Sequence, residues 1–403
     1  MKNFKNLLVA STALLAANLA FAQTWTPTSS PGTNWIGIAS SADGNKLVAA
    51  AVAASAGPGP IYISTNAGTS WALTSAPNNS WSSVASSADG SKLVASAYFN
   101  GPIYVSTNSG VTWQLTSAPN KNWGCVASSA DGAILVAGVD DSNGGIYLST
   151  NSGATWILTS APAKDSCAVA LSADGATQVA GFLFDGSIFT STNFGATWIS
   201  NAVPVEYWRG VAVSADGTRL AAASSTYDGV IYTSTNAGVT WMNANAPVND
   251  YNAIASSADG TRLVAVVKEP QMPDFVAICT STDSGMTWTP NDVPAASWYA
   301  VSSSADGGKL AAVAVNGFSP SVLPVYTSQC VLAPGLNIAL SSTNFVVSWT
   351  VPSTAFVLQQ NSDLSTTNWV TGTNTPVLNL THLHNEMTLP LAASNNFYRL
   401  KTP

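Results

Sequence analysis

Ser87-Ala88-Asp89-Gly90 is a phrase that this chain of 403 residues contains seven times. A second phrase, Ser-Thr-Asn-Ser-Gly-Val-Thr-Trp at residues 106–113, follows it, and close variants recur in five other repeats. The aspartates of the first phrase stand 42 to 47 residues apart, at Asp43, Asp89, Asp131, Asp174, Asp216, Asp259 and Asp306. A period in the low forties that contains several short strands is typical of the blades of a β-propeller.

One repeat, residues 81–122, shows how a blade would be built. Its alternating or β-branched runs predict four antiparallel strands, at residues 81–87, 92–97, 103–107 and 112–115. Asp89 and Gly90 suit the tight turn between the first two strands, because aspartate accepts local hydrogen bonds and glycine adopts a positive φ. The repeat therefore predicts an all-β fold.

The two ends of the repeat array predict that the ring of blades is closed. The seventh repeat has no counterpart of the fourth strand, whereas residues 24–31 match residues 112–119 of the second repeat. We predict that a strand at Trp25 completes the last blade and covers an edge that would otherwise be exposed. The predicted domains are a signal peptide (1–22), a seven-bladed β-propeller closed by the N-terminal strand (23–330) and a small β-sandwich (331–403).

The last 73 residues, 331–403, leave the repeat. Six alternating runs predict a β-sandwich of immunoglobulin or fibronectin type III kind, at residues 336–340, 345–351, 356–360, 369–373, 387–391 and 397–400. The stretch from Leu358 to Trp369 and the ending at residues 395–400 are similar to C-terminal modules of exported bacterial proteins. Such a module would anchor the protein, sort it or contact the cell surface.

The first 22 residues are typical of a secretory signal peptide. Lys2 and Lys5 precede an apolar run at residues 7–20, and Ala20-Phe21-Ala22 matches a cleavage site. We expect a mature chain that starts at Gln23 and is secreted, periplasmic or on the bacterial cell surface. No later stretch approaches the roughly 20 apolar residues of a spanning helix, so no membrane span is expected.

Composition narrows the range of partners. The formal net charge is −7 and only 8% of the residues are charged. This composition argues against a nucleic-acid partner, because proteins bind nucleic acid mainly through basic patches. No glycine-rich phosphate loop or Cys/His metal motif is present, so we predict neither a cofactor nor a metal. The expected partner is a glycan or an envelope or extracellular protein, and the chain is expected to be a monomer.

Four cysteines fit an oxidising compartment. Cys125 and Cys167 start equivalent strands of neighbouring repeats one residue out of phase, so their side chains can face each other. We predict a bridge between them, with Cys279 and Cys330 as the other pair. Four cysteines allow three pairings, and the alternative is that they are small buried apolar residues.

The second phrase resembles the Asp-box, or BNR repeat, of sialidase-like propellers, whose pattern is Ser-x-Asp-x-Gly-x-x-Trp. The resemblance covers residues 23–330 and implies the propeller fold. Asparagine replaces the aspartate in five of six copies, which suits a structural turn, at Asn66, Asn108, Asn151, Asn193, Asn236 and Asp283. Such propellers occur in sialidases, glycanases, sorting receptors and a photosystem assembly factor, so the resemblance does not specify an activity.

The residues expected of an enzyme are missing. A sialidase-like activity would imply three arginines around a carboxylate, but the propeller has only three in all, and Arg219 and Arg262 share one repeated turn position. Both histidines lie in the C-terminal part, and nothing in the sequence pairs the two carboxylates that glycoside hydrolysis requires. We therefore predict a non-catalytic binding or scaffold protein. The alternative is a sialidase-like or other glycoside hydrolase.

The loops opposite the repeated turns vary from repeat to repeat, and variable loops on a rigid scaffold usually carry recognition. In six of seven repeats an aromatic residue opens the first strand at this face, and Arg209 stands in a charged segment that departs from the repeat. The aromatics either surround the channel mouth and stack on sugar rings, or wedge between blades. The predicted ligand-binding residues are Trp35, Trp81, Trp123, Trp208, Arg209, Tyr251 and Trp298.

Overall fold

The structure is a computed structural model that describes residues 23–402, except for 54–56, 227, 269–276, 316–322, 331–333, 342–343, 353–355, 373 and 391–395. The side chains of Ser166, Cys167 and Ser341 are also outside the description, as is the predicted signal peptide. The described residues form 35 strands and no helix, which confirms the all-β prediction. None of this part of the chain therefore forms a helix that could cross a membrane.

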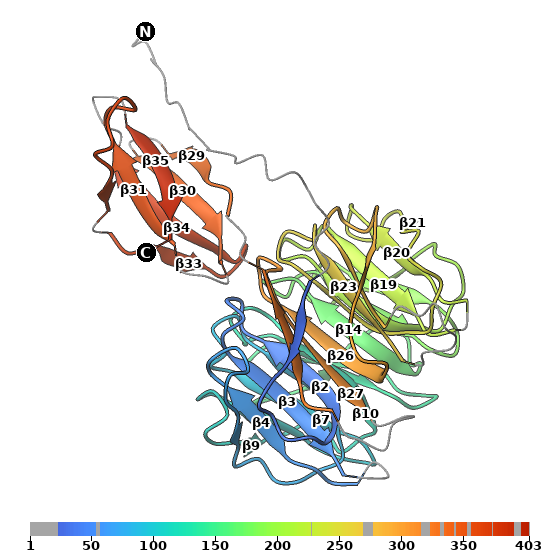
Figure 1. Ribbon diagram of the computed structural model, residues 1–403. Coiled ribbons are helices and arrows are strands. Elements are labelled where there is room, and N and C mark those ends of the chain that lie inside the picture. Colours follow the sequence, from blue (N-terminus) through green and yellow to red (C-terminus); the bar gives the residue numbers. More distant parts are fainter. Residues whose placement is uncertain are drawn as a thin grey trace.

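Among the described residues, 25–329 form seven antiparallel sheets of four strands each (Figure 1). The first three sheets are β2 (Asn34–Ser40), β3 (Leu47–Val52), β4 (Ile61–Ser64) and β5 (Ala72–Leu73); β6 (Trp81–Ser86), β7 (Leu93–Ala97), β8 (Ile103–Ser106) and β9 (Gln114–Leu115); and β10 (Trp123–Ser128), β11 (Leu135–Val139), β12 (Ile146–Ser149) and β13 (Ile157–Leu158).

The next three sheets repeat this order along the chain. They are β14 (Ser166–Leu171), β15 (Gln178–Phe182), β16 (Ile188–Ser191) and β17 (Ile199–Ser200); β18 (Trp208–Val213), β19 (Leu220–Ser224), β20 (Ile231–Ser234) and β21 (Met242–Asn243); and β22 (Tyr251–Ser256), β23 (Leu263–Val267), β24 (Ile278–Ser281) and β25 (Thr289–Asn291). The last sheet joins β26 (Ser297–Ser303), β27 (Lys309–Val315) and β28 (Tyr326–Gln329) to β1 (Trp25–Pro27).

Strand β1 brings the N-terminal part of the chain to the last repeat. Trp25 pairs with Ser328 and Pro27 pairs with Tyr326, in the antiparallel register that the fourth strand has in the other sheets. The Trp25 side chain is buried, and its indole N–H donates to the Asn291 side-chain oxygen of the preceding sheet at 3.3 Å. Figure 1 shows this blue segment beside the orange strands of the last repeat.

The seven repeated alanines are joined by a circle of backbone hydrogen bonds. The amide of Ala42 donates to the carbonyl of Ala88, and the same bond links each alanine to the next, at 2.7–2.9 Å. The last amide, that of Ala305, donates back to the carbonyl of Ala42 at 2.7 Å. The first strands of successive sheets also contact each other, and β26 contacts β2. The series of sheets therefore returns to its start.

Each repeated turn is held by its own serine and aspartate. In the second repeat the Ser87 hydroxyl and the Ser91 amide donate to the Asp89 carboxylate at 2.7 and 2.9 Å, and the Lys92 amide donates to the Ser87 hydroxyl. Gly90 has φ +66°, and a Cβ atom there would lie 2.7 Å from the Lys46 side chain of the preceding repeat. The turn thus accounts for both the aspartate and the glycine of the phrase.

These turns predict a loss of stability in acid. Burial raises the pKa of the Asp89 carboxyl, but hydrogen bonds from Ser87 and Ser91 outweigh it, so that the pKa lies below its usual value. The pKa is also lowered at Asp43, Asp131, Asp216 and Asp259. A depressed carboxyl pKa contributes stability that is present above the unfolded pKa, about 3.9, and is lost as the pH falls through the folded value.

We therefore expect the thermal unfolding midpoint to be nearly constant from pH 7 to pH 5 and to fall steeply below about pH 4. Differential scanning calorimetry at a series of pH values would measure this. The Asp89→Asn variant should unfold at a lower temperature at pH 7 and depend less on pH in acid. A midpoint at pH 3 equal to that at pH 7 would contradict the role of the turn carboxylates.

The asparagines of the second phrase act within their own turns. Asn108 accepts hydrogen bonds from the Ser106 hydroxyl and the Thr112 amide, and its side-chain nitrogen donates to the Thr112 hydroxyl. Asp283 takes the same place, but there the Thr287 hydroxyl donates to the carboxylate. A threonine hydroxyl can donate or accept, so either residue satisfies the turn. These contacts agree with the structural role that was predicted for the six positions.

The described residues from 337 to 401 form two further sheets over one core. One sheet has the order β29 (Asn337–Ser341), β30 (Asn344–Thr350), β34 (His384–Pro390), β33 (Val377–Asn379), and the other the order β32 (Val370–Thr371), β31 (Val357–Asn361), β35 (Phe397–Lys401). Phe345, Trp349, Leu358, Met387 and Tyr398 are buried together in the core. The sequence patterns did not predict β33. We call residues 337–402 the C-terminal module.

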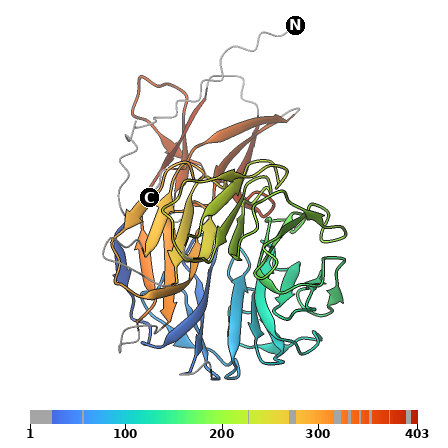
Figure 2. The same ribbon diagram turned by 90° about the vertical axis from the view of Figure 1, so that its right-hand side faces the viewer.

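The C-terminal module lies next to one end of the body (Figures 1 and 2) and contacts the repeated turns. Six of the turn alanines form one buried apolar cluster with Val351, and the partly buried Leu378, Leu380 and Leu383 pack against it. Leu383 has φ +53°, and it lines a hollow of about 150 Å³ with the alanines of all seven turns. The alanine of the repeated phrase thus takes part, in every repeat, in the contact with the C-terminal module.

Leu383 provides a direct test of this contact. We expect Leu383→Asn to weaken it, because asparagine tolerates a positive φ but would place an amide against the alanines. Small-angle scattering should show a larger radius of gyration than that of the natural protein. Leu340→Asn, at a position of the same module that is 67% exposed, is the control and should change nothing. Equal scattering curves for both variants would contradict the contact.

Candidate ligand-binding site

A β-bulge sets the direction of one side chain in the first strand of every sheet. The pairing register slips by one residue directly after the position of the opening aromatic, for example between Trp208 and Gly210 in β18. The same slip occurs in the first strands of the other six sheets. A bulge leaves one residue outside the regular pairing and re-aims its side chain. In β18 that residue is Arg209.

Six of the seven bulge residues line a cavity of about 480 Å³, which we call the axial cavity. Its wall contains Ile36, Ser82, Gly124, Arg209, Asn252 and Tyr299. Two residues further along the strands, towards the repeated turns, a ring of β-branched side chains forms the floor, made of Val126, Val169, Val211, Ile254 and Val301. The cavity thus has an apolar floor and a wall of mixed character.

The opening aromatics themselves are buried, so the predicted ring of ligand-stacking aromatics is wrong. Trp35, Trp81, Trp123, Trp208, Tyr251 and Trp298 are all at most 1% exposed and belong to the cores between the sheets. The Trp208 ring, for example, packs edge-on against the ring of Tyr232, with the two ring centroids 6.0 Å apart. The physical reason is the bulge, which directs the following residue, not the aromatic, to the axis.

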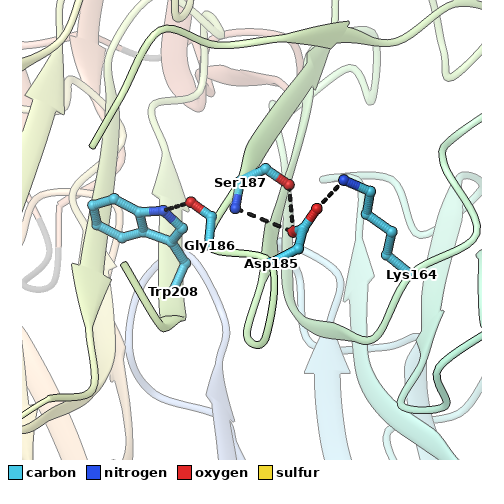
Figure 3. A network of polar contacts seen from close by, with 5 residues as sticks. All are labelled: Lys164, Asp185, Gly186, Ser187 and Trp208. Atoms are coloured by element: carbon cyan, nitrogen blue, oxygen red, sulfur yellow. Dashed lines mark hydrogen bonds and ion pairs between the residues drawn. The ribbon is translucent and has the colours of Figure 1, made fainter. Parts of the chain in front are cut away.

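Two of these indoles also fasten the variable loops. Trp81 donates to the carbonyl of Gly59 at 2.8 Å, and Trp208 donates to that of Gly186 at 2.9 Å. Figure 3 shows the loop around Gly186, where the Asp185 carboxylate accepts from the Ser187 amide and hydroxyl and pairs with Lys164. The loops at the mouth of the axial cavity are therefore tied to the rigid sheets.

A tyrosine and an aspartate stand at one side of the cavity mouth. Tyr98 donates a hydrogen bond to the Asp140 carboxylate, and both residues line the cavity. Burial raises the pKa of Asp140, the hydrogen bond from Tyr98 lowers it and the charge of Asp165 raises it, with a net increase. The charge of Arg209, which also lines the cavity, lowers the same pKa. Burial and the nearby carboxylates raise the pKa of Tyr98 to about 12, so it stays a neutral donor.

Asn252 lies in the wall of the cavity and has a buried side-chain oxygen. Its side-chain nitrogen donates to the carbonyl of Tyr299 at 2.6 Å, which settles the orientation of the amide. Its side-chain oxygen has no hydrogen-bond partner among the described residues, although the residue is only 4% exposed. A buried acceptor without a donor is costly.

Phe99 stands at the rim of the axial cavity in an unusual conformation. It has φ +54° and is 65% exposed, and its ring lies 5.1 Å from that of Tyr98. A bulky residue with positive φ is an outlier, and backbone strain of this kind clusters at functional sites. The following amide, that of Asn100, donates to the Asn122 side chain at 2.7 Å and holds the loop in place.

The sequence-based prediction and the axial cavity share one strand end but differ in most of their side chains. Of the seven predicted residues only Trp81 and Arg209 line the axial cavity, and Trp81 is almost completely buried. Tyr98, Asn252 and Tyr299 were missed, whereas Asp140 had been noted as a charged departure from the repeat. A signal was present, because the residue after the opening aromatic differs in all seven repeats, namely Ile36, Ser82, Gly124, Cys167, Arg209, Asn252 and Tyr299.

The cysteines are only partly described. Cys125 lines the axial cavity, but the side chain of Cys167 lies outside the described ones, so their bridge stays a prediction. The predicted pairing of Cys279 with Cys330 is wrong, because neither is bonded to another cysteine. Cys279 is completely buried in β24 with its thiol 3.9 Å from the Tyr251 hydroxyl. The side-chain nitrogen of Gln23 donates a hydrogen bond to the sulfur of Cys330 at 3.8 Å.

The number of carboxylates in the axial cavity can be compared with the pair that a glycoside hydrolase requires. Among the described residues that line the axial cavity, Asp140 is the single carboxylate. Asp141 and Asp165 lie close enough to affect its pKa, but neither lines the cavity, and the Asp141 carboxylate accepts from the Asn122 side chain at 2.8 Å. Glycoside hydrolysis places two carboxylates on either side of one bond, and the described lining of the cavity does not contain such a pair.

Comparison with known proteins identifies the fold. No family model and no curated protein sequence matches the chain. Similar solved structures include the GH74 xyloglucanase of Xanthomonas campestris, with 15% identity and a TM-score of 0.59 over 81% of this chain and 59% of that one. YCF48 bound to D1 peptide has 14% identity and a TM-score of 0.54, and covers 77% of this chain and 97% of that one.

A chain of the mitotic checkpoint complex is also similar, with 17% identity and a TM-score of 0.57 over 75% of this chain and 93% of that one. Identities this low show the fold alone, and the fold is that of a β-propeller. The chain spans only about 59% of the length of the xyloglucanase. These neighbours include both a hydrolase and proteins that act within complexes, so they do not select a function.

Proposed function

We propose that this chain is an exported, closed seven-bladed β-propeller with an immunoglobulin-like C-terminal sandwich, and that it binds a partner without catalysing a reaction. The circle of hydrogen bonds through the seven turn alanines and the pairing of β1 with β28 support the closed ring. The signal-peptide pattern of residues 1–22 supports export from a bacterial cell. The partner is a glycan or a protein of the envelope or the extracellular space.

The observation that carries the proposal is the axial cavity. It contains residues that differ from one repeat to the next, and it places Arg209, Asp140, Tyr98 and Asn252 around one space. A structural role would favour the same residue in every repeat, as at the buried aromatics. A volume of about 480 Å³ lies in the range of roughly 300–1,000 Å³ that is usual for ligand pockets.

The C-terminal module supports the choice of this face. It packs on the repeated turns through Val351 and Leu383, at the end of the channel opposite to the variable loops. The variable face, with the exposed Phe99, Phe184 and Tyr207, is left for a partner. Exposed apolar side chains around a concave site are typical of a binding surface.

Binding on glycan and peptide arrays, with release of reducing ends measured in the same wells, tests the proposal. The Ser82→Trp variant fills the axial cavity, and Ser200→Trp, on the exposed outer strand β17, adds the same side chain elsewhere. We expect a signal that Ser82→Trp abolishes and Ser200→Trp retains. Binding that survives Ser82→Trp would contradict the site, and release of sugar by the natural protein would support the hydrolase alternative.

A further inference from the structure

We infer that the axial cavity binds an organic ammonium ion that carries an apolar group, with the positive charge at the mouth and the apolar group on the floor. The inference rests on the proposed function and names the chemistry of its ligand. It follows from the carboxylate and the aromatic rings at the mouth of the cavity, and from the apolar side chains of its floor.

One carboxylate stands at the mouth of the axial cavity. Asp140 directly follows β11, at the strand end where the variable loops lie, and it lines the cavity. The Tyr98 hydroxyl donates a hydrogen bond to it, which leaves further lone pairs of the carboxylate as acceptors. An ammonium N–H group suits such an acceptor, because hydrogen bonds between two ionised groups are among the strong ones.

The charges around Asp140 make this side of the cavity negative. Asp141 and Asp165 raise the pKa of Asp140 through their charges, and Arg209 lowers it. The balance is three carboxylates against one guanidinium. Arg209 is also the single cation among the described residues that line the cavity. The mouth therefore attracts a cation and repels an anion.

Aromatic rings at the mouth favour an organic cation. Tyr98 and Phe99 line the cavity, with their ring centroids 5.1 Å apart, and Phe99 is 65% exposed. The face of an aromatic ring attracts a cation through its π electrons. A metal ion would need several ligands at once, and the described part of the chain has no group of three or more His, Cys, Asp and Glu side chains that could hold one.

The floor selects an apolar group on this cation. None of its side chains forms hydrogen bonds, and they are Val126, Val169, Val211, Ile254 and Val301. A sugar placed there would lose the water around its hydroxyls without gaining partners, which is costly. An aliphatic or aromatic group gains from leaving water. A ligand with a charged end and an apolar end can therefore satisfy the mouth and the floor together.

The pairing of β10 with β11 gives the length of such a ligand. Val126 of the floor pairs with Ala137, and Asp140 stands three residues further along the chain. A strand rises about 3.3 Å per residue, so the carboxylate and the floor are roughly 10 Å apart along the strand direction. A hexyl or phenylpropyl group on the ammonium nitrogen can reach from the mouth to the floor.

The test compares probes of nearly one shape and different charge, by calorimetry on the full chain at pH 7. The probes are 3-phenylpropylammonium, 3-phenylpropanol and 3-phenylpropanoate. We expect the ammonium ion to bind at least tenfold more tightly than the alcohol, and the carboxylate to bind most weakly. Hexylammonium should bind at least tenfold more tightly than ethylammonium, because an ethyl group leaves the floor uncovered. Equal binding of the ammonium ion and the alcohol would overturn the inference.

Two variants locate the charge that binds the ammonium ion. Asp140→Asn removes the negative charge but keeps an oxygen that accepts from Tyr98. It should weaken binding of the ammonium ion at least fivefold and leave binding of the alcohol nearly unchanged. Asp292→Asn removes the same charge from an exposed position that does not line the cavity, and should have no effect. Equal affinities of Asp140→Asn and the natural protein would overturn the inference.

Peptide probes separate two sources of such a ligand. Phe-Ala-Ala amide carries an ammonium group beside an apolar side chain, and its N-acetyl form lacks the charge. Binding of the first peptide alone would support a protein amino terminus as the ligand, and binding of phenylpropylammonium alone would support a free amine. Failure of every ammonium probe, with an array signal that Ser82→Trp abolishes, would overturn the inference and leave the proposed function intact. Ammonium binding that Ser82→Trp does not change would overturn both.

Discussion

Deletion of residues 23–31 is expected to lower the thermal unfolding midpoint by more than 10 °C and to make the protein aggregate. The deletion removes β1, leaves the edge of β28 unpaired and takes the buried Trp25 out of the core between the last two sheets. Truncation of a buried tryptophan to alanine alone costs about 3–5 kcal/mol. An uncovered strand edge is in addition a template for pairing with another chain.

Calorimetry and light scattering would measure these effects. Trp25→Phe is the graded control, because it keeps most of the buried ring and loses only the hydrogen bond from the indole to Asn291, worth about 1 kcal/mol. Trp25→Ala should fall between this variant and the deletion. A deletion variant with an unchanged midpoint would show that the ring of sheets does not depend on its N-terminal strand.

Trp208→Ala is expected to destabilise the chain by about 3–5 kcal/mol, because its side chain is completely buried between two sheets. The substitution also removes the hydrogen bond to Gly186, which ties the variable loop at Asp185 to the next sheet. We therefore expect weaker ligand binding as a second effect, through a displaced loop rather than a lost contact.

Urea unfolding and binding measurements can separate the two effects. Trp208→Phe should lower the free energy of unfolding by about 1 kcal/mol and displace the loop at Asp185, because phenylalanine keeps an apolar ring but has no N–H group. Leu115→Ala, at a position that is 62% exposed, should change stability by less than about 0.5 kcal/mol. A Trp208→Ala protein as stable as the natural one would mean that this aromatic is not part of the core.

The repeat made much of the architecture predictable. Short-range chemistry controls the turns, because Asp89 and Gly90 act on atoms a few residues away, and the same pattern recurs wherever those residues recur. The match of residues 24–31 to a fourth strand likewise predicted Trp25 beside the last repeat, where it pairs with Ser328. The sequence pattern does not reveal a shift of one residue in the pairing register of a strand.

That slip accounts for the error in the site. Strict alternation along β18 would direct Trp208 and Gly210 to one side and Arg209 to the other, and the pattern alone does not say which side meets the axis. The bulge turns Arg209 and Asn252 inwards and buries the aromatics. The contact of Leu383 with the turn alanines was equally hidden, because residues far apart in the chain make it.

The amino-acid sequence alone was thus sufficient to predict the strands of the repeats, their turns and the pairing of β1 with the last repeat. Each of these depends on local hydrogen bonding or on the repeat period, which the sequence shows directly. The axial cavity, the partners of Asp140 and the contact of Leu383 with the turn alanines arise only when seven strands converge on one axis. Their geometry depends on packing between distant segments, and no local pattern records it.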